Sequence, residues 1–174
     1  MDRPFHRVPL RNSQRAMHDE AEMLDVLGRV QYVTLALCQG DRPYAVTLSC
    51  GLDLSRKALY FHTALKGLKL DILENNPNAC FTAVEDLGYQ AGDCSHKFRS
   101  IVGYGTLARV TDRAEMRHGF ETMMDQLEPD PEALKAKFLD QDAVYARTVV
   151  LRLDIDHLTG KASLPPKSTG AVNP

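Results

Sequence analysis

Thr63, Lys66 and Lys69 are the residues of this 174-residue chain whose types and spacing best suit ligand chemistry. They lie in the segment LYFHTALKGLKLDILENNPNACF at positions 59–81, where a strand pattern ends at His62 and Thr63 and a helix pattern starts near Lys69. The threonine offers a hydroxyl, the lysines offer positive charge, and the first turn of a helix offers N–H groups without a partner inside the helix. This combination predicts a cradle for the phosphate group of a small ligand.

An alternative interpretation of this segment is that Lys66 and Lys69 belong to a solvated helix face and that His62 is a surface residue. The segment lacks the glycine signature of a P-loop, so spacing alone does not separate the two interpretations. The chain has 21 Lys and Arg against 23 Asp and Glu, a net charge of -2. Nucleic-acid binders normally carry a basic excess, so we expect no nucleic-acid partner and a single ligand phosphate held by local donors.

The other cysteines and histidines do not suggest a metal site. Cys94 and His96 are two ligands with no second pair nearby, whereas a structural zinc ion takes four. The 4 cysteines stand singly at irregular spacings, which favours reduced thiols. No apolar run approaches the ~18 residues of a membrane span, and no hydrophobic signal segment follows the N-terminus. We therefore expect a cytoplasmic protein with no bound metal and no membrane contact.

The elements that must position the candidate residues are mostly strands. Apolar and β-branched runs bounded by polar turns predict six strands, at 30–38, 44–53, 58–64, 78–87, 98–110 and 144–155. Helical spacing predicts helices at 19–27, 66–75, 112–127 and 130–139. Because short turns join most strands, the sheet should be antiparallel, and such a sheet loses its exposed edges by closing on itself. We expect a mainly β fold, a six-stranded antiparallel barrel with flanking helices.

The chain is expected to form one domain between two irregular segments. Residues 1–17 have no periodicity and are predicted to form an N-terminal arm, and residues 18–158 form the domain. Residues 159–174 are rich in Pro, Gly, Ser and Lys and are predicted to form a C-terminal tail. Gly103 and Gly105 lie inside one predicted strand, which indicates a bulge or a bend at a barrel corner.

Four sequence motifs, in consistent order, resemble those of a known family. DRPYAVTL at 41–48 is similar to G-x-P-Y-v-v-P-l, and LYFHTA at 59–64 with GLK at 67–69 is similar to l-Y-F-H-x-a-x-x-G-x-K. NNPNACF at 75–81 is similar to r-x-N-P-x-v-c-F, and FRSIVGYG at 98–105 is similar to y-r-S-V-v-g-f-G. The chain thereby resembles the pyridoxamine 5'-phosphate oxidase-like, FMN-binding split-barrel superfamily. Its greatest similarity is to the branch of the 5-nitroimidazole-resistance (Nim) proteins.

The resemblance implies a split β-barrel that binds flavin mononucleotide (FMN) at the interface of a C2 homodimer. One strand of such a barrel lies with its backbone against the isoalloxazine ring, and the strand end before the short helix lies near the ribityl phosphate. The matching positions are Val46, Thr47, Leu48 and Ser49 for the ring, His62, Thr63, Lys66 and Lys69 for the phosphate side, and Arg99 and Ser100 near the phosphate or the second subunit.

The chain departs from the family pattern in two places. At Thr47 the chain departs from the proline that many Nim-like relatives carry in v-v-P-l, so the ring-facing strand is expected to differ slightly. Near the C-terminus we find no paired Arg and His that would hold pyridoxal phosphate, which disfavours a true pyridoxamine phosphate oxidase.

The function implied by the resemblance is an FMN-dependent oxidoreductase that passes electrons from NAD(P)H to a small organic acceptor, with a nitroaromatic such as a 5-nitroimidazole as one candidate. His62 is the candidate catalytic residue, as a proton donor, and the alternative that we favour is a plain hydrogen bond to the FMN phosphate or ring edge. A flavin carrier, sensor or electron-transfer protein without a substrate is the alternative function. Haem and a deazaflavin are the alternative cofactors.

Overall fold

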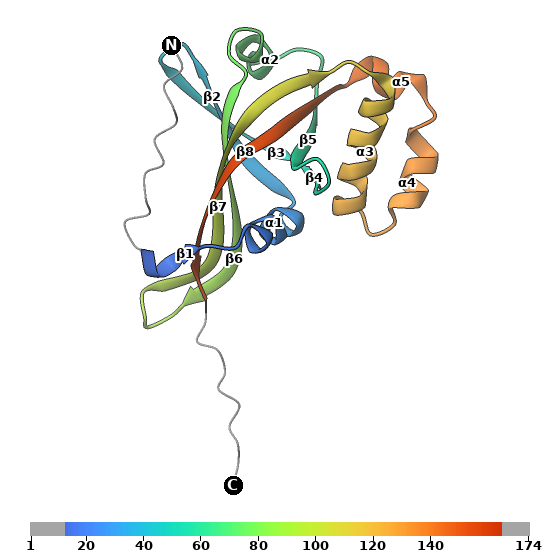
Figure 1. The fold of residues 1–174 in the computed structure, drawn as a ribbon. Helices are drawn as coiled ribbons and strands as arrows, with labels where there is room; N and C mark the ends of the chain where they lie inside the picture. Colours follow the sequence, from blue (N-terminus) through green and yellow to red (C-terminus); the bar gives the residue numbers. More distant parts are fainter. Residues whose placement is uncertain (1–12, 165–174) are drawn as a thin grey trace.

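A large antiparallel sheet forms most of the molecule (Figure 1). The computed structural model describes residues 13–164. The strands are β1 (Ala16–Met17), β2 (Tyr32–Gln39), β3 (Arg42–Ser49), β4 (Gly51–Asp53), β5 (Ala58–Thr63), β6 (Asn78–Gln90), β7 (Ser95–Val110) and β8 (Val149–Ser163). Their order is β3-β2-β6-β7-β8-β5-β4, and β1 pairs with β8 beside this path. The mainly β, antiparallel class predicted from the sequence is confirmed.

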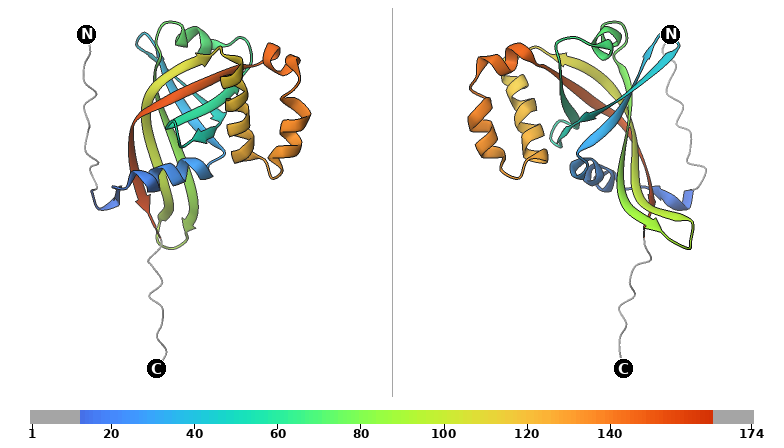
Figure 2. Two further views of the ribbon diagram at one scale, coloured as in Figure 1. Left: turned by 45° about the vertical axis from the view of Figure 1, so that its right-hand side comes forward. Right: turned by 180° about the vertical axis from the view of Figure 1, so that it is seen from behind.

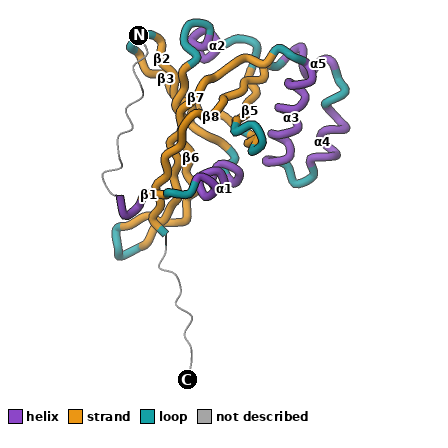
Figure 3. Tube along the Cα trace, viewed as in Figure 1, coloured by secondary structure: helices purple, strands orange, loops and turns teal. Residues whose placement is uncertain are grey.

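Helices cover the ends and one side of the sheet (Figures 2 and 3). They are η1 (Ser13–Arg15), α1 (Glu20–Arg29), α2 (Leu68–Leu73), α3 (Arg113–Leu127), α4 (Pro131–Phe138) and α5 (Asp142–Arg147). The side chain of Asp19 caps α1 by accepting the N–H of Ala21 at 2.8 Å, and Asp112 and Asp130 cap α3 and α4 in the same way. The four helices predicted from the sequence are all present, with ends shifted by a few residues.

The sheet contains eight strands rather than the six predicted. Part of the difference arises because the strand predicted at 44–53 is divided at Cys50 into β3 and β4, which lie at opposite ends of the sheet. The N–H of Cys50 donates to the carbonyl of Gln31 at 3.3 Å, so the chain turns there from one edge toward the other. The ladder of hydrogen bonds is therefore not closed into a continuous barrel, and β3 and β4 are its two end strands.

The C-terminal strand is the second correction. The strand predicted at 144–155 begins instead at Val149, and residues 142–147 form α5, because the Tyr145 side chain is buried there and its hydroxyl donates to the carbonyl of Leu139 at 2.8 Å. Tertiary packing thus overrides the β propensity of Val144 and Tyr145.

The same strand extends past residue 158, where the sequence predicts the end of the domain. β8 continues to Ser163, and Lys161 and Gly160 pair with Ala16 and Met17 of β1. The end of the predicted arm and the start of the predicted tail therefore belong to the sheet. The remainder of both segments, residues 1–12 and 165–174, lies outside the described residues.

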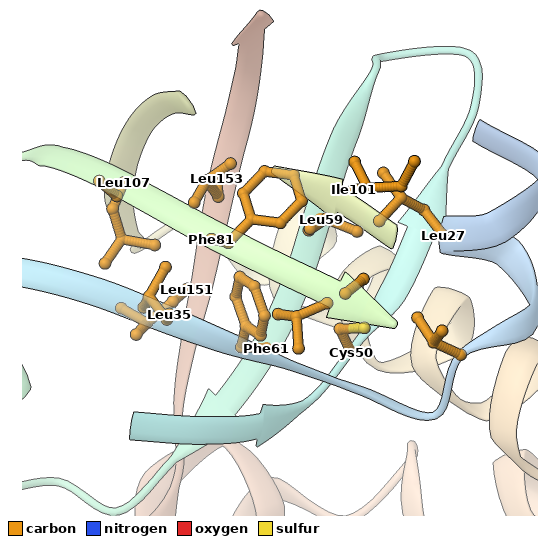
Figure 4. Packing of buried hydrophobic residues seen from close by; sticks show 14 of the residues in the cluster. Leu27, Leu35, Cys50, Leu59, Phe61, Phe81, Ile101, Leu107, Leu151 and Leu153 are labelled. Carbon is orange, nitrogen blue, oxygen red and sulfur yellow. The ribbon is translucent and has the colours of Figure 1, made fainter. Parts of the chain in front are cut away.

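Two hydrophobic clusters form on the two faces of β5. The larger fills the barrel and includes Leu59 and Phe61 of β5 with Phe81, Ile101 and Leu151 from other strands (Figure 4). The smaller lies between the opposite face and the helices α3 to α5. Its members are Ala58, Tyr60, Val110, Phe120, Met123, Leu139, Tyr145 and Val150. Because successive side chains of a strand point to opposite faces, β5 is buried on both sides along most of its length.

The bulge indicated by Gly103 and Gly105 is confirmed. The register between β7 and β8 shifts between Tyr104 and Gly105. A Cβ atom at Gly105 would lie 2.0 Å from the carbonyl oxygen of Asp154, and one at Gly103 would lie 2.2 Å from the Phe81 ring. The strands approach so closely at this point that only glycine fits.

Asp53 is the buried charged residue of the described chain, with 7% of its surface exposed. It ends β4, and its carboxylate accepts hydrogen bonds from the Ser55 N–H at 2.9 Å, the Ser55 hydroxyl at 2.7 Å and the Arg56 N–H at 3.1 Å. His118 Nε2 of α3 lies 2.6 Å from its other oxygen. Burial alone would raise the pKa of Asp53, but the hydrogen bonds outweigh it and lower the pKa to about 2.

Replacing Asp53 by asparagine should therefore destabilise the fold by about 2 kcal/mol at pH 7, since the unfolded-state pKa is 3.8. A folded-state pKa below the unfolded value gives stability that is fully present above pH 3.8 and is lost as the pH falls toward 2. Urea unfolding of wild type and Asp53→Asn at pH 7 and pH 3 measures this. The difference in unfolding free energy should shrink at the lower pH, and a difference independent of pH would refute the assignment.

Candidate functional site

Thr63 and Lys69 meet at the end of β5, as the spacing predicted. The ammonium of Lys69 donates to the Thr63 hydroxyl at 2.9 Å. Between them Gly67 has a φ of 150°, in a region that favours glycine, and its carbonyl accepts from the N–H groups of Leu70 at 2.8 Å and Asp71 at 3.3 Å. The tight turn returns the chain into α2 so that Lys69 faces the strand end.

The positive charge of this turn is available to a ligand. No carboxylate of residues 13–164 forms an ion pair with Lys66 or Lys69. Leu65 and Leu68 beside them are 49% and 45% exposed, so the turn also presents apolar surface to a ligand. Two uncompensated cations, a hydroxyl and exposed apolar side chains suit an anion attached to an apolar body.

The strand β3 contacts β5, the strand that ends at Thr63, and has a free edge. In the fold α2 contacts β2. Val46 and Leu48 pack against the barrel core, whereas Thr47 and Ser49 face outward, with the Thr47 hydroxyl 3.1 Å from that of Thr34. β3 is an end strand of the sheet and pairs only with β2 within residues 13–164. Its other edge therefore offers backbone donors and acceptors to a ligand.

His62 lies on the face of β5 opposite to Thr63. Its ring is 6.3 Å from the Phe120 ring of α3, on the side of the smaller hydrophobic cluster. Desolvation by these apolar neighbours lowers the pKa of His62 below its ordinary value, so the ring is mainly neutral at pH 7. The structure therefore does not bring His62 together with Thr63 and Lys69, although the three are near neighbours in sequence.

Arg99 and Ser100 also point to opposite faces. Arg99 turns toward α1 and forms ion pairs with Glu85 at 2.5 Å and Asp25 at 3.0 Å. The hydrogen bonds to these carboxylates raise the pKa of Arg99. Arg99 pairs with Ala162 near one end of β8, whereas Thr63 pairs with Val149 at the other end. Within one chain, neither Arg99 nor Ser100 reaches the Thr63–Lys69 pair.

Ser100 belongs to a broad outward face of the sheet. A row of uncharged side chains crosses five neighbouring strands, and we call it the outer row. It consists of Thr47, Thr34, Thr82, Val102 and Thr159, which are successive partners in the sheet register. Tyr32 and Val84 beside the row are 60% and 56% exposed. Lys161, the register partner of Ser100, lies on the same face beside the row. An uncharged row of this width is typical of a surface that contacts another molecule.

The hairpin of β6 and β7 contains the weak metal motif. The Tyr89 hydroxyl donates to Cys94 Sγ at 3.5 Å, and His96 Nε2 lies 2.8 Å from Asp86 Oδ1. Within residues 13–164 no cluster of three or more His, Cys, Asp or Glu side chains is placed to hold a metal ion. None of the helices in this part of the chain has the length and apolar character needed to cross a membrane.

The sequence interpretation missed a pocket beneath the helices. A cavity of about 340 Å³ opens between His62 and the apolar sides of α3 and α4. The available signal was the Met123-Met124 pair and the apolar residues of the 130–139 helix, which have no partner in a barrel alone. Which strand face these helices cover is decided by packing, so the pocket could not be placed from the pattern.

Several solved structures share this fold. A candidate 5-nitroimidazole antibiotic resistance protein from Bacteroides thetaiotaomicron is 22% identical, with a TM-score of 0.70 over 84% of this chain and 85% of that one. The flavocytochrome Anf3 from Azotobacter vinelandii is 17% identical, with a TM-score of 0.74 over 90% and 73% of the two chains. An FAD and heme binding protein from Mycobacterium smegmatis is 19% identical, with a TM-score of 0.70 over 86% and 73%. At these identities the likeness establishes the split-barrel fold.

Sequence comparison assigns the family directly. None of the curated proteins matches this chain. The family model of pyridoxamine 5'-phosphate oxidase matches residues 19–162, a segment that contains all four motifs of the sequence resemblance. A match over most of the chain, together with the shared fold, confirms the superfamily that the motifs indicated. The chain belongs to the pyridoxamine 5'-phosphate oxidase family.

Proposed function

We propose that this protein binds FMN, with the phosphate at Thr63, Lys66 and Lys69 and the ring along the free edge of β3. The observation that carries the proposal is the Thr63–Lys69 pair, in which a hydroxyl and an uncompensated ammonium lie 2.9 Å apart. Charge-assisted hydrogen bonds from an ammonium to phosphate oxygens are the usual means of holding a phosphate. Membership of the family and the likeness to flavin-binding proteins support a flavin as the ligand.

The reaction that we propose is electron transfer from NAD(P)H to a small organic acceptor. A bound flavin supplies the reversible uptake of two electrons, whereas the protein supplies binding, orientation and electrostatics. Likeness to a candidate 5-nitroimidazole antibiotic resistance protein supports a nitroaromatic acceptor. A flavin carrier or electron-transfer protein is the second candidate function. It is favoured by the position of His62, which faces away from Thr63 and therefore from the proposed phosphate site.

We also propose that two copies associate through the outer row. The row is uncharged across five strands, and the exposed Tyr32 and Val84 extend it. Within one chain Ser100 lies far from Thr63. A second copy would bring its own Ser100 to the interface. A flavin bound at such an interface is what the family resemblance leads us to expect, and this expectation supports a role for the outer row in dimer formation.

An absorption spectrum of the purified protein before and after addition of FMN or FAD tests the cofactor. We expect flavin bands, preference for FMN, bleaching with NADH or NADPH, and reoxidation by a nitroaromatic. Flavin bands that NAD(P)H does not bleach would support the second candidate, a flavin carrier. A haem spectrum, or no uptake of flavin, would contradict the proposal.

Gel filtration with mass detection tests the dimer. We expect the mass of a dimer for the wild type. Thr82→Arg should dissociate the dimer, whereas Ala136→Arg, on the exposed side of α4, should not.

A further inference from the structure

The pocket beside His62 lies on the opposite face of β5 from the Thr63–Lys69 pair. It has a volume of about 340 Å³ and opens between β5 and the helices α3 and α4, which stand side by side in Figure 1. The residues that matter to its chemistry are His62, Phe120, Met123, Met124, Leu134 and Phe138. An engineered cavity of ~150 Å³ holds benzene, so this pocket has room for about two rings.

The pocket wall is formed by rings, thioethers and aliphatic groups. Phe120 and Phe138 provide aromatic rings, and Met123 and Met124 provide flexible side chains whose sulfur atoms make favourable contacts with aromatic rings. Glu128, which is exposed, is the one acidic side chain of the lining, and the lining contains no lysine or arginine. The ammonium of Lys137 lies outside the lining, 5.0 Å from the centroid of the Phe138 ring. The wall therefore favours an aromatic ligand, and the lining itself offers an anion no counter-charge.

The floor of the pocket is rigidly held. Phe120 and Met123 are 6% and 3% exposed, and the Phe120 ring packs edge-on against Tyr145 at 5.7 Å. Tyr145 is fixed in turn by its hydrogen bond to the Leu139 carbonyl and by the Arg113 guanidinium, 3.3 Å from its ring centroid. Met124 and Leu134, which also line the pocket, are only half-buried. A fixed floor with an adaptable wall is typical of a largely preformed ligand site.

We infer that this pocket binds an uncharged aromatic small molecule of one or two rings, whose polar substituent meets the imidazole of His62. His62 is the only side chain of the lining, apart from Glu128, that can form a strong hydrogen bond. A neutral imidazole has one N–H donor and one acceptor nitrogen and serves either kind of substituent. The inference does not depend on flavin binding, because Thr63 and Lys69 lie across the strand.

Methionine methyl NMR tests this binding with the full chain. The probes are 4-nitrobenzyl alcohol and 4-nitrobenzoate, an uncharged and an anionic molecule of nearly equal shape. We expect the alcohol to shift the methyl signals of Met123 and Met124 in a saturable way, and the benzoate to bind at least tenfold more weakly. The signals of Met17 and Met23, which belong to the barrel core, should not move. Absence of a saturable shift at Met123 and Met124, or equal binding of both probes, would overturn the inference.

A variant that fills the pocket provides the second arm. Leu134→Trp should weaken binding of the alcohol at least tenfold, whereas Leu54→Trp, at an exposed position in the turn after β4, should leave it unchanged. If Leu134→Trp does not fold, Met124→Trp blocks the same half-buried wall. Full retention of the Met123 shift in a folded, filled variant would place the probe elsewhere. Flavin content should equal that of wild type in both variants, which separates this site from the proposed cofactor site.

Discussion

Replacing both Thr63 and Lys69 by alanine is expected to weaken FMN binding by roughly 2–4 kcal/mol, or about 30- to 1,000-fold in Kd. The double change removes a hydroxyl donor and the ammonium that lies 2.9 Å from it. Hydrogen bonds to a charged group contribute ~1.5–3 kcal/mol each, and solvent exposure of the site reduces the sum. Quenching of flavin fluorescence in a titration measures the change. Full flavin occupancy in the double variant would place the phosphate elsewhere.

Two controls make this result specific. Lys137→Ala removes a lysine from the exposed side of α4 and should leave the Kd unchanged. The loss of binding free energy in the double variant should differ from the sum of the losses in the two single variants, because the Thr63 and Lys69 side chains contact each other. Thermal unfolding should be nearly the same in all variants, since neither residue belongs to a hydrophobic cluster.

Replacing Gly105 by alanine is expected to cause a large loss of stability, about 3 kcal/mol or more, at the upper end of overpacking costs. The new Cβ would lie 2.0 Å from the carbonyl oxygen of Asp154 on the neighbouring strand. That carbonyl belongs to the backbone, and the next residue, Ile155, is held by an N–H to Lys57 carbonyl hydrogen bond of 2.9 Å. Relief therefore requires β7 and β8 to separate. Urea unfolding with a linear extrapolation measures the loss.

Gly28→Ala is the matched control for Gly105→Ala. Gly28 lies inside α1, and the nearest atom to an added Cβ there is Leu52 Cδ2 at 3.9 Å, an ordinary contact. Alanine should therefore stabilise the protein, by about 0.5–1 kcal/mol, through its better helix propensity. Equal unfolding free energies for Gly105→Ala and wild type would mean that the two strands can separate at the bulge without cost.

Local patterns determined most of the secondary structure. The hairpin of β2 and β3 follows from alternating apolar residues around a turn at Gly40, whose φ of 62° suits glycine. The start of α1 follows from Asp19, whose carboxylate caps the helix. These features depend on residues a few positions apart, so the pattern alone contains them. The break at Cys50 and the helix α5 depend on contacts with distant segments, and both were missed.

The same distinction separates the parts of the candidate site. The sequence pattern predicted that Thr63 and Lys69 would meet, because a strand end, a glycine turn and a helix start set that contact over six residues. The faces to which His62 and Arg99 turn were decided by the tertiary structure alone. Successive side chains of a strand point to opposite faces, which the sequence pattern contains. Whether a given face contacts helices, the core or solvent depends on tertiary packing. Arg99 thus forms an ion pair with Asp25, 74 residues away, and His62 contacts Phe120 of α3, which follows β7.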